Sequence, residues 1–152
     1  MEGLMAKITV SSEITAISES GAPIGDPEIT GEQALGELTV DGERVTVKYR
    51  THDESGAQIL STLSISGATV TFDREAGVCT HMVFEQGVTH TAIYSVGAYS
   101  FDVTVTARRV RGTLGAEGGR IDLYYDMCFG SDQRSVRMRI DVLTKNKARS
   151  GL

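Results

Sequence analysis

The sequence is poor in residues that crosslink or interrupt a fold. Its 152 residues include only two cysteines, Cys79 and Cys128, and two prolines, Pro23 and Pro27. Two cysteines are too few for a disulfide framework, and free thiols are typical of a reducing compartment. A chain of about this length buries roughly 68–70% of its unfolded surface and needs no crosslink. We therefore expect a cytoplasmic protein with both thiols reduced.

Long apolar runs are also absent. No run approaches the ~20 residues of a membrane helix, and the start, MEGLMAKITVSSE, has no apolar stretch behind a basic head, as a signal peptide would. The formal net charge of −5 repels nucleic acid and acidic membranes at long range. The sequence thus predicts one domain over residues 1–152, with flexible tails at 1–4 and 146–152, and neither nucleic acid nor membrane as a partner.

Catalytic motifs are missing as well. There is no G-x-S-x-G elbow, no H-E-x-x-H pair and no phosphate loop. We predict no cofactor, no metal and no catalytic residue, and we rank an enzyme third among the possible functions. An enzyme would need Arg74, a tyrosine and an acidic group to converge in one pocket with strongly perturbed pKa values.

What the sequence does contain is alternation with a period of two. The stretches 99–107 and 136–142 alternate apolar and polar residues, a pattern typical of strands with one wet face. Turn signals such as DGE and GAEGG recur every 8–15 residues or so. This spacing predicts ten strands, at 5–17, 28–40, 44–52, 57–66, 68–74, 78–86, 88–95, 98–111, 119–129 and 133–145.

Strands joined by such tight turns form a meander, and a long meander tends to close because closure removes its exposed edges. We predict an all-β fold, a single antiparallel up-and-down barrel of about eight to ten strands. The second strand is the least regular, since Thr30 and Gln33 also fit a helical capping box, although two glycines disfavour a helix there. Both prolines lie in SESGAPIGDPE, which we expect to be the longest loop.

Four segments resemble the sequences of one known family: TFDREAG, MVFEQG, AIYSVGAYSFDVTVTA and above all GGRIDLYYDM. The family is the YwiB-like group of bacterial proteins, whose function is unknown. The resemblance covers residues from about 5 to 143 and is most specific in the final hairpin, at Ile121, Leu123, Tyr125, Asp126 and Met127. It implies a lipocalin-like, or calycin, barrel. It implies no activity, cofactor or catalytic residue, because none is known for the family.

The tyrosines gather near one end of the predicted barrel, because alternate connections of a meander meet at the same end. Tyr49, Tyr99 and Tyr125 share the parity of the inward apolar residues, and Arg74 lies on an inward face at the same end. Tyrosine rings with an arginine can hold an anionic or amphipathic ligand by hydrogen bonds and cation–π contacts. Equally, the rings could close a barrel that is filled by its own side chains.

The orientation of Tyr94 depends on the register of its hairpin. A two-residue turn at 86–87 would point Tyr94 outward. The same turn would bring His81, Glu85 and His90 together, either as a loose divalent-metal site or as solvated polar residues.

Charged residues are expected on the outer face of the last three strands. They form either a ladder of opposite charges across neighbouring strands or a patch for an anion or RNA. The residues are Arg108, Arg111, Asp122, Asp126, Arg137 and Arg139.

Two functions follow from the predicted fold. The first is a cytoplasmic binding module that holds a small apolar or amphipathic ligand at the tyrosine-lined end, with Arg74 as the charged anchor and Tyr49, Tyr99 and Tyr125 as the lining. The alternative is a packed barrel that acts as a scaffold, through protein–protein interaction or as a homodimer. A hollow interior near Tyr125 would favour the first, and an uncovered edge strand the second.

Overall fold

The computed structural model describes residues 3–144. The expected C-terminal tail, 146–152, and the last residue of the predicted final strand lie outside this range. Of the expected N-terminal tail, Leu4 is already part of a strand and pairs with Leu38, while residues 1–2 lie outside the described range. The described part of the chain contains no helix that is long and apolar enough to cross a membrane.

The fold is a closed, ten-stranded, antiparallel up-and-down barrel, as predicted. Each strand pairs with the next along the chain, and the last pairs with the first, from Ala6 opposite Thr144 to Ile17 opposite Gln133. The strands are β1 (Leu4–Ile17), β2 (Pro23–Asp41), β3 (Arg44–His52), β4 (Gln58–Ser66), β5 (Thr69–Glu75), β6 (Val78–Phe84), β7 (Thr89–Val96), β8 (Tyr99–Gly115), β9 (Gly118–Phe129) and β10 (Asp132–Thr144).

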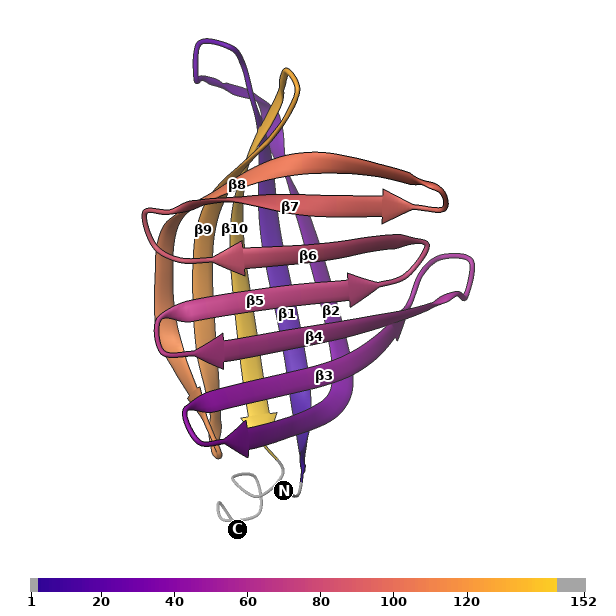
Figure 1. Cartoon of the computed structure of the whole chain (residues 1–152), viewed down its shortest axis with the longest axis vertical. Helices are drawn as coiled ribbons and strands as arrows, with labels where there is room; N and C mark the ends of the chain where they lie inside the picture. Colours follow the sequence, from indigo (N-terminus) through magenta and orange to yellow (C-terminus); the bar gives the residue numbers. More distant parts are fainter. Residues whose placement is uncertain (1–2, 145–152) are drawn as a thin grey trace.

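The barrel is flattened into two layers whose strands cross, and two long strands turn the corners (Figure 1). One layer contains β3 to β7, and the other contains β9, β10 and β1. Strand β8 passes from one layer to the other at a β-bulge, where Ala107 pairs with Tyr125 but Arg109 pairs with Tyr124. A bulge bends a strand and increases its twist, so the extra residue, Arg108, marks the corner.

The second corner lies at Gly36 in β2. A Cβ atom at this position would collide with the carbonyl oxygen of Lys48 and would lie 2.8 Å from the Cβ of Tyr49. Only glycine lets the backbones of β2 and β3 approach this closely.

The two prolines lie in β2, so the prediction of a long proline loop was wrong. Pro23 is the first residue of β2, and Pro27 falls in the irregular stretch where the register with β1 shifts. Pairing of β2 with β3 begins only at Gly36, so within residues 3–144 the part of β2 before Gly36 pairs with β1 alone. Proline is tolerated at a strand start, at a bulge and on an unpaired edge, and this part of β2 offers all three.

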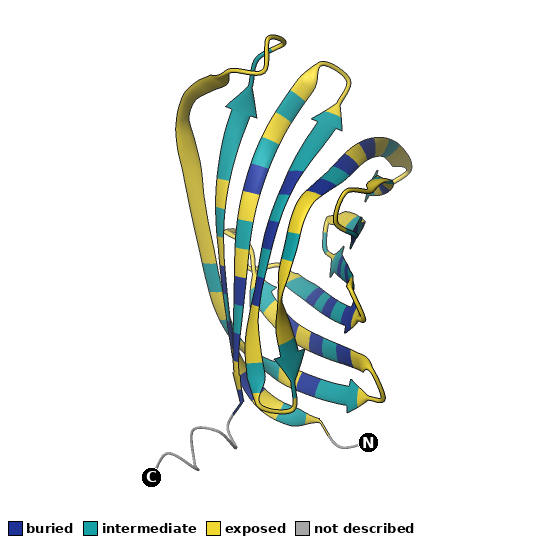
Figure 2. Cartoon of the chain, turned by 90° about the vertical axis from the view of Figure 1, so that its left-hand side faces the viewer, coloured by how far each residue is buried: buried dark blue, intermediate teal, exposed yellow. Residues whose placement is uncertain are grey.

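Burial alternates along most strands, which confirms the predicted inward faces (Figure 2). Phe72 and Phe84 are the largest fully buried side chains of a core that the ten strands share. Fully burying one side chain of this size contributes about 1.5–3 kcal/mol. Both cysteines are free thiols, with Cys79 exposed and Cys128 partly buried, as expected for residues on the non-adjacent strands β6 and β9.

Candidate functional site at the barrel mouth

One row of inward-facing residues runs across seven neighbouring strands near the end of the barrel where β1 and β2 are joined. The strand register places these residues directly opposite one another, from β2 to β8. The row consists of Gly36, Tyr49, Ser61, Arg74, Thr80, Tyr94 and Phe101. Two predicted site residues, Tyr49 and Arg74, are therefore separated by a single strand.

Glu32 joins the two. It comes from the part of β2 that does not pair with β3, and its carboxylate accepts a hydrogen bond of 2.9 Å from the Tyr49 hydroxyl. The same oxygen, Oε1, forms an ion pair with Arg74. Burial, reinforced by the negative charge of Glu32, raises the pKa of Tyr49 to about 12. Tyr49 is thus a neutral hydrogen-bond donor, and Arg74 already has a partner for its charge.

A cavity of about 660 Å³ lies beside this row. Such a volume falls within the range of small-molecule sites. Its walls are mostly apolar and aromatic, and its polar groups include Glu32 and Arg74. The apolar lining includes Val10, Ile14, Met82, Tyr94, Phe101, Val103, Tyr125, Met127, Phe129, Val136 and Met138. The barrel interior is therefore hollow at the end where β1 and β2 are joined, which we call the mouth, and packed with side chains elsewhere.

Tyr125 forms part of the cavity wall, opposite the row. Its ring packs on Phe84, with the centroids 4.7 Å apart, and only 3% of the residue is exposed. Burial raises the pKa of Tyr125 well above its usual value. Within the part of the chain that the structure describes, its hydroxyl makes no hydrogen bond. A hydroxyl at a cavity wall without a protein partner is available to a ligand or to water.

The fourth predicted lining residue, Tyr99, is not in the site. It is the first residue of β8, pairs with Val96 beside the turn, and is 79% exposed. Tyr99 has the predicted inward parity, but it lies at the exposed end of β8 and does not line the cavity. Phe101, two residues further along β8, occupies the position expected of Tyr99, and its ring packs at a tilt against the rings of Tyr94 and Phe129.

Tyr94 points inward, because the pairing of β6 with β7 is shifted by one residue from the register that the two-residue turn at 86–87 would give by itself. Strand β6 ends at Phe84 and β7 begins at Thr89, with a hydrogen bond from the Val88 amide to the Glu85 carbonyl. The resulting register places Tyr94 opposite Thr80 rather than Cys79. Burial raises its pKa, and its hydroxyl lies 3.9 Å from the Met82 sulfur.

Charges at the mouth are paired. Arg134, the second arginine in the cavity wall, forms an ion pair of 3.2 Å with Asp132. Together with the pair between Arg74 and Glu32, this leaves the cavity with apolar walls and balanced charges. Such a surface suits an apolar body with a neutral or zwitterionic polar group better than a bare anion.

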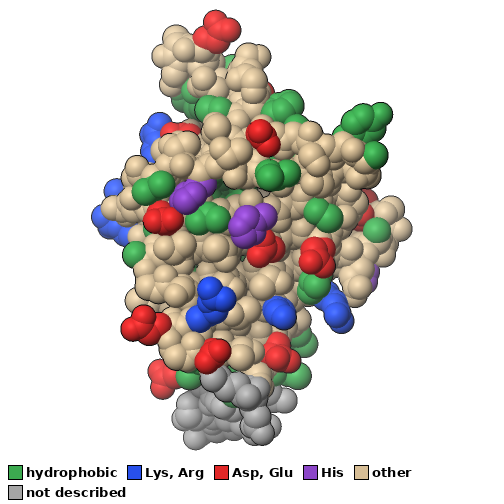
Figure 3. Space-filling view, in the orientation of Figure 1, with side chains coloured by type: hydrophobic (Ala, Val, Ile, Leu, Met, Phe, Trp, Pro, Cys, Tyr) green, Lys and Arg blue, Asp and Glu red, His purple; other side chains and the backbone are tan. Residues whose placement is uncertain are grey.

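The histidines do not gather into one cluster. His81 contacts Asp73, and His90 lies 3.0 Å from Glu85, so each imidazole has its own acidic partner. Histidine and acidic side chains lie side by side on the face formed by β3 to β7 (Figure 3). Between residues 3 and 144, no three His, Cys, Asp or Glu side chains are grouped as metal ligands.

The predicted charge ladder is present on the outer face of β8, β9 and β10. Arg108 forms an ion pair with Asp126 at 2.5 Å, and Arg139 pairs with Asp122 at 2.9 Å. Arg137 instead lies over the Tyr124 ring, 4.7 Å from its centroid.

Three residues of the site were not predicted from the sequence: Glu32, Phe101 and Phe129. One feature of the sequence could have indicated Glu32, because an acidic residue with inward parity on a strand needs a buried partner for its charge. Its partner, Arg74, lies 42 residues away in the sequence, and no local pattern connects them.

Comparison with known proteins identifies a family but no activity. A family model described as a domain of unknown function (DUF1934) matches residues 13–140. The crystal structure of the ywiB protein from Bacillus subtilis has a similar fold, with a TM-score of 0.75 and 19% sequence identity. The similarity covers 91% of this chain and 92% of that one. No curated protein matches the sequence.

Proposed function

The chain belongs to the YwiB-like family of domains of unknown function (DUF1934), and on that premise we propose a function from its geometry: it is a cytoplasmic binding module for a small amphipathic ligand. The apolar body of the ligand occupies the cavity at the barrel mouth. Its polar group meets the Tyr125 hydroxyl and the Arg74–Glu32 pair.

The observation that carries this proposal is the combination of a cavity of about 660 Å³ with the Tyr125 hydroxyl in its wall. A barrel closed only by packing would have no reason to leave an apolar space of this size at one end. The paired charges of the cavity wall also indicate the charge of the ligand, which the sequence alone did not predict. We propose that the polar group of the ligand is neutral or zwitterionic and accepts a hydrogen bond from Tyr125.

Native mass spectrometry of the full chain purified from cells tests this function. We expect a bound small molecule on the wild-type protein and a reduced amount on Tyr125→Phe and on Arg74→Ala. The matched control is Tyr99→Phe, which removes the same hydroxyl from an exposed residue and should leave the adduct unchanged. If the purified protein carries no bound molecule, we measure the binding of the neutral apolar dye Nile red to the same set of variants.

Two results would contradict the proposal. One is unliganded wild-type protein that also fails to bind Nile red. The other is equal binding by all variants, which would place the ligand elsewhere. Thermal melting of each variant establishes that a loss of binding does not arise from unfolding.

A second candidate function, a scaffold for protein–protein interaction, is favoured by the free edge of β2. Residues 28–35 pair regularly with β1 on one side, and within residues 3–144 they have no strand on the other. Such an edge accepts an additional strand. Glu28 lies at this edge and Asp26 lies just before it, and no lysine or arginine occurs between Lys7 and Arg44.

We propose a basic extended segment of another protein as the occupant of this edge, since a second copy of β2 would oppose like charges. Peptide arrays of lysine-containing extended segments test this. Gln33→Pro, which removes one backbone donor from the strand, is the blocking variant, and Gln58→Pro, at the start of the paired strand β4, is the control. Binding that survives Gln33→Pro would refute docking at this edge.

A further inference from the structure

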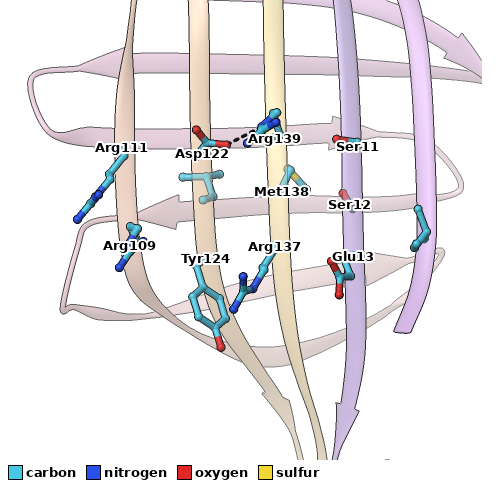
Figure 4. Close-up of a pocket in the computed structure, with 12 residues that line it drawn as sticks. Ser11, Ser12, Glu13, Arg109, Arg111, Asp122, Tyr124, Arg137, Met138 and Arg139 are labelled. Carbon is cyan, nitrogen blue, oxygen red and sulfur yellow. Dashed lines mark hydrogen bonds and ion pairs between the residues drawn. The ribbon is translucent and has the colours of Figure 1, made fainter. Parts of the chain in front are cut away.

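Three arginines without a carboxylate partner surround a hollow on the outer face of the barrel, on the opposite side of the sheet from the cavity at the mouth. They are Arg109 and Arg111 on β8 and Arg137 on β10 (Figure 4). Within residues 3–144, none of the three forms an ion pair, whereas Arg108, Arg120 and Arg139 on the same face each have an aspartate. The ladder of opposite charges thus leaves an excess of positive charge around this hollow.

The strand register explains how these arginines come together. One row across the sheet contains Arg109, Tyr124, Arg137 and Glu13, on β8, β9, β10 and β1. The adjacent row contains Arg111, Asp122, Arg139 and Ser11 on the same four strands. The bulge in β8 is essential, because it places the consecutive residues Arg108 and Arg109 both on the exposed face. Without it, strict alternation from the inward-facing Ala107 would turn both Arg109 and Arg111 inward.

The neighbouring side chains hold part of this cluster in place. Arg108 and Arg137 both lie over the Tyr124 ring, 5.3 and 4.7 Å from its centroid. Asp122 is engaged by Arg139, so its charge is not available to Arg111. Figure 4 shows Arg109 beside Tyr124 and Arg111 further along β8 at the level of Asp122, with Arg137 on the other side of the Tyr124 ring.

The local charge is opposite in sign to that of the whole protein. Four arginines but only two carboxylates, Glu13 and Asp122, line the hollow, while the chain carries a formal net charge of −5. The hollow measures about 590 Å³, which is enough for a small molecule. Guanidinium groups recognise phosphate oxygens with paired, charge-assisted hydrogen bonds. Concentrating like charges costs free energy, which an anion bound between them would offset.

We propose that this outer hollow, lined by Arg109, Arg111 and Arg137, binds a small ligand that carries two or more linked phosphates. Arg109 and Arg111 are two residues apart on one strand and reach one phosphate. Arg137 is two strands away, about 10 Å across the sheet, and reaches a second one. Tyr124 is a positioning residue, because its ring keeps Arg137 over the hollow.

Calorimetric titration of the full chain with inorganic pyrophosphate at low ionic strength tests the proposal. We expect Arg109→Gln, Arg111→Gln and Arg137→Gln each to weaken binding about three- to fivefold, the range for single exposed charged contacts. The matched control is Arg120→Gln, which removes an arginine of the same face that is paired with Asp141 and does not line the hollow. It should leave the affinity unchanged, and orthophosphate should bind more weakly than pyrophosphate.

Several results would overturn the proposal. Wild-type protein that does not bind pyrophosphate at millimolar concentration rules it out. An equal loss of affinity in Arg120→Gln would show nonspecific attraction to the whole face. Tight binding of a single-stranded RNA without any binding of pyrophosphate would assign the surface to a polymer and exclude a small ligand. Since the substituted side chains are exposed, unchanged melting temperatures will show that all variants are folded.

Discussion

Tyr49 on β3 donates a hydrogen bond to Glu32 on β2, although Tyr49 pairs with Gly36 and Glu32 lies four residues before the point where β2 begins to pair with β3. The bond spans the gap that opens where β2 leaves β3, and it closes the wall of the mouth between Gly36 and the free edge. A buried phenol beside a carboxylate is held in its neutral form. This relationship makes the stability of the mouth sensitive to alkaline pH.

We expect the free energy of unfolding to fall between pH 10 and pH 12. In the unfolded chain the Tyr49 phenol loses its proton near pH 10, whereas in the fold its pKa is raised to about 12. The retained proton therefore stabilises the fold fully below pH 10, and this contribution, on the order of 2–3 kcal/mol, is lost as the pH rises through 12. Urea unfolding at successive pH values measures it. Tyr49→Phe should fall less steeply, and an identical slope in both proteins would contradict the assignment.

The ion pair between Arg74 and Glu32 should contribute measurably to stability. The Arg74 side chain is 31% exposed and the Glu32 side chain is 23% exposed. Solvent therefore screens this ion pair less than it screens the ion pairs on the outer face of the barrel. We expect a coupling energy of about 1 kcal/mol or more in a double-mutant cycle of Arg74→Gln and Glu32→Gln. The exposed pair Arg120–Asp141 is the control and should give a smaller coupling. Equal couplings would show that burial at the mouth has no effect.

Gly36→Ala should destabilise the protein by about 1–3 kcal/mol or more, because the added methyl group would displace β3 at the corner of the barrel. Gly31→Ala is the matched control on the same strand. There the nearest atom to a Cβ would be the Val10 carbonyl oxygen at 3.5 Å, so the substitution should be tolerated. Chemical denaturation of both variants checks the prediction, and comparable losses would mean that close approach at Gly36 is unimportant.

Tyr125→Phe should leave stability almost unchanged. The ring contact with Phe84 is retained, and the hydroxyl has no hydrogen-bond partner among residues 3–144 that its removal would leave unsatisfied. We expect a cost below about 1 kcal/mol in urea unfolding. A larger loss would reveal that the hydroxyl is held by an internal water, and would weaken its assignment to a ligand.

Much of this protein could be predicted from its sequence, because period-two alternation reports directly on a sheet with one buried face. The strand count, the meander and the inward orientation of Tyr49 and Tyr125 followed from that pattern and from the turn residues between strands. Arg74 was placed at the correct end for the same reason, since position along a meander determines which connections share an end.

Other features depended on contacts that no local pattern encodes. The inward orientation of Tyr94 follows from a one-residue shift in the pairing of β6 with β7, which lies beside a turn at 85–88 that also bonds to Ala107 on β8. Tyr99 has inward parity but is exposed at the end of β8, and the prolines lie in β2 because the first half of this strand, within residues 3–144, pairs only with β1. Glu32 reaches Arg74 only because β2 bends at Gly36. The sequence determined the strands and their faces through local periodicity, whereas register, bends and the meeting of distant side chains were decided by packing across the closed barrel.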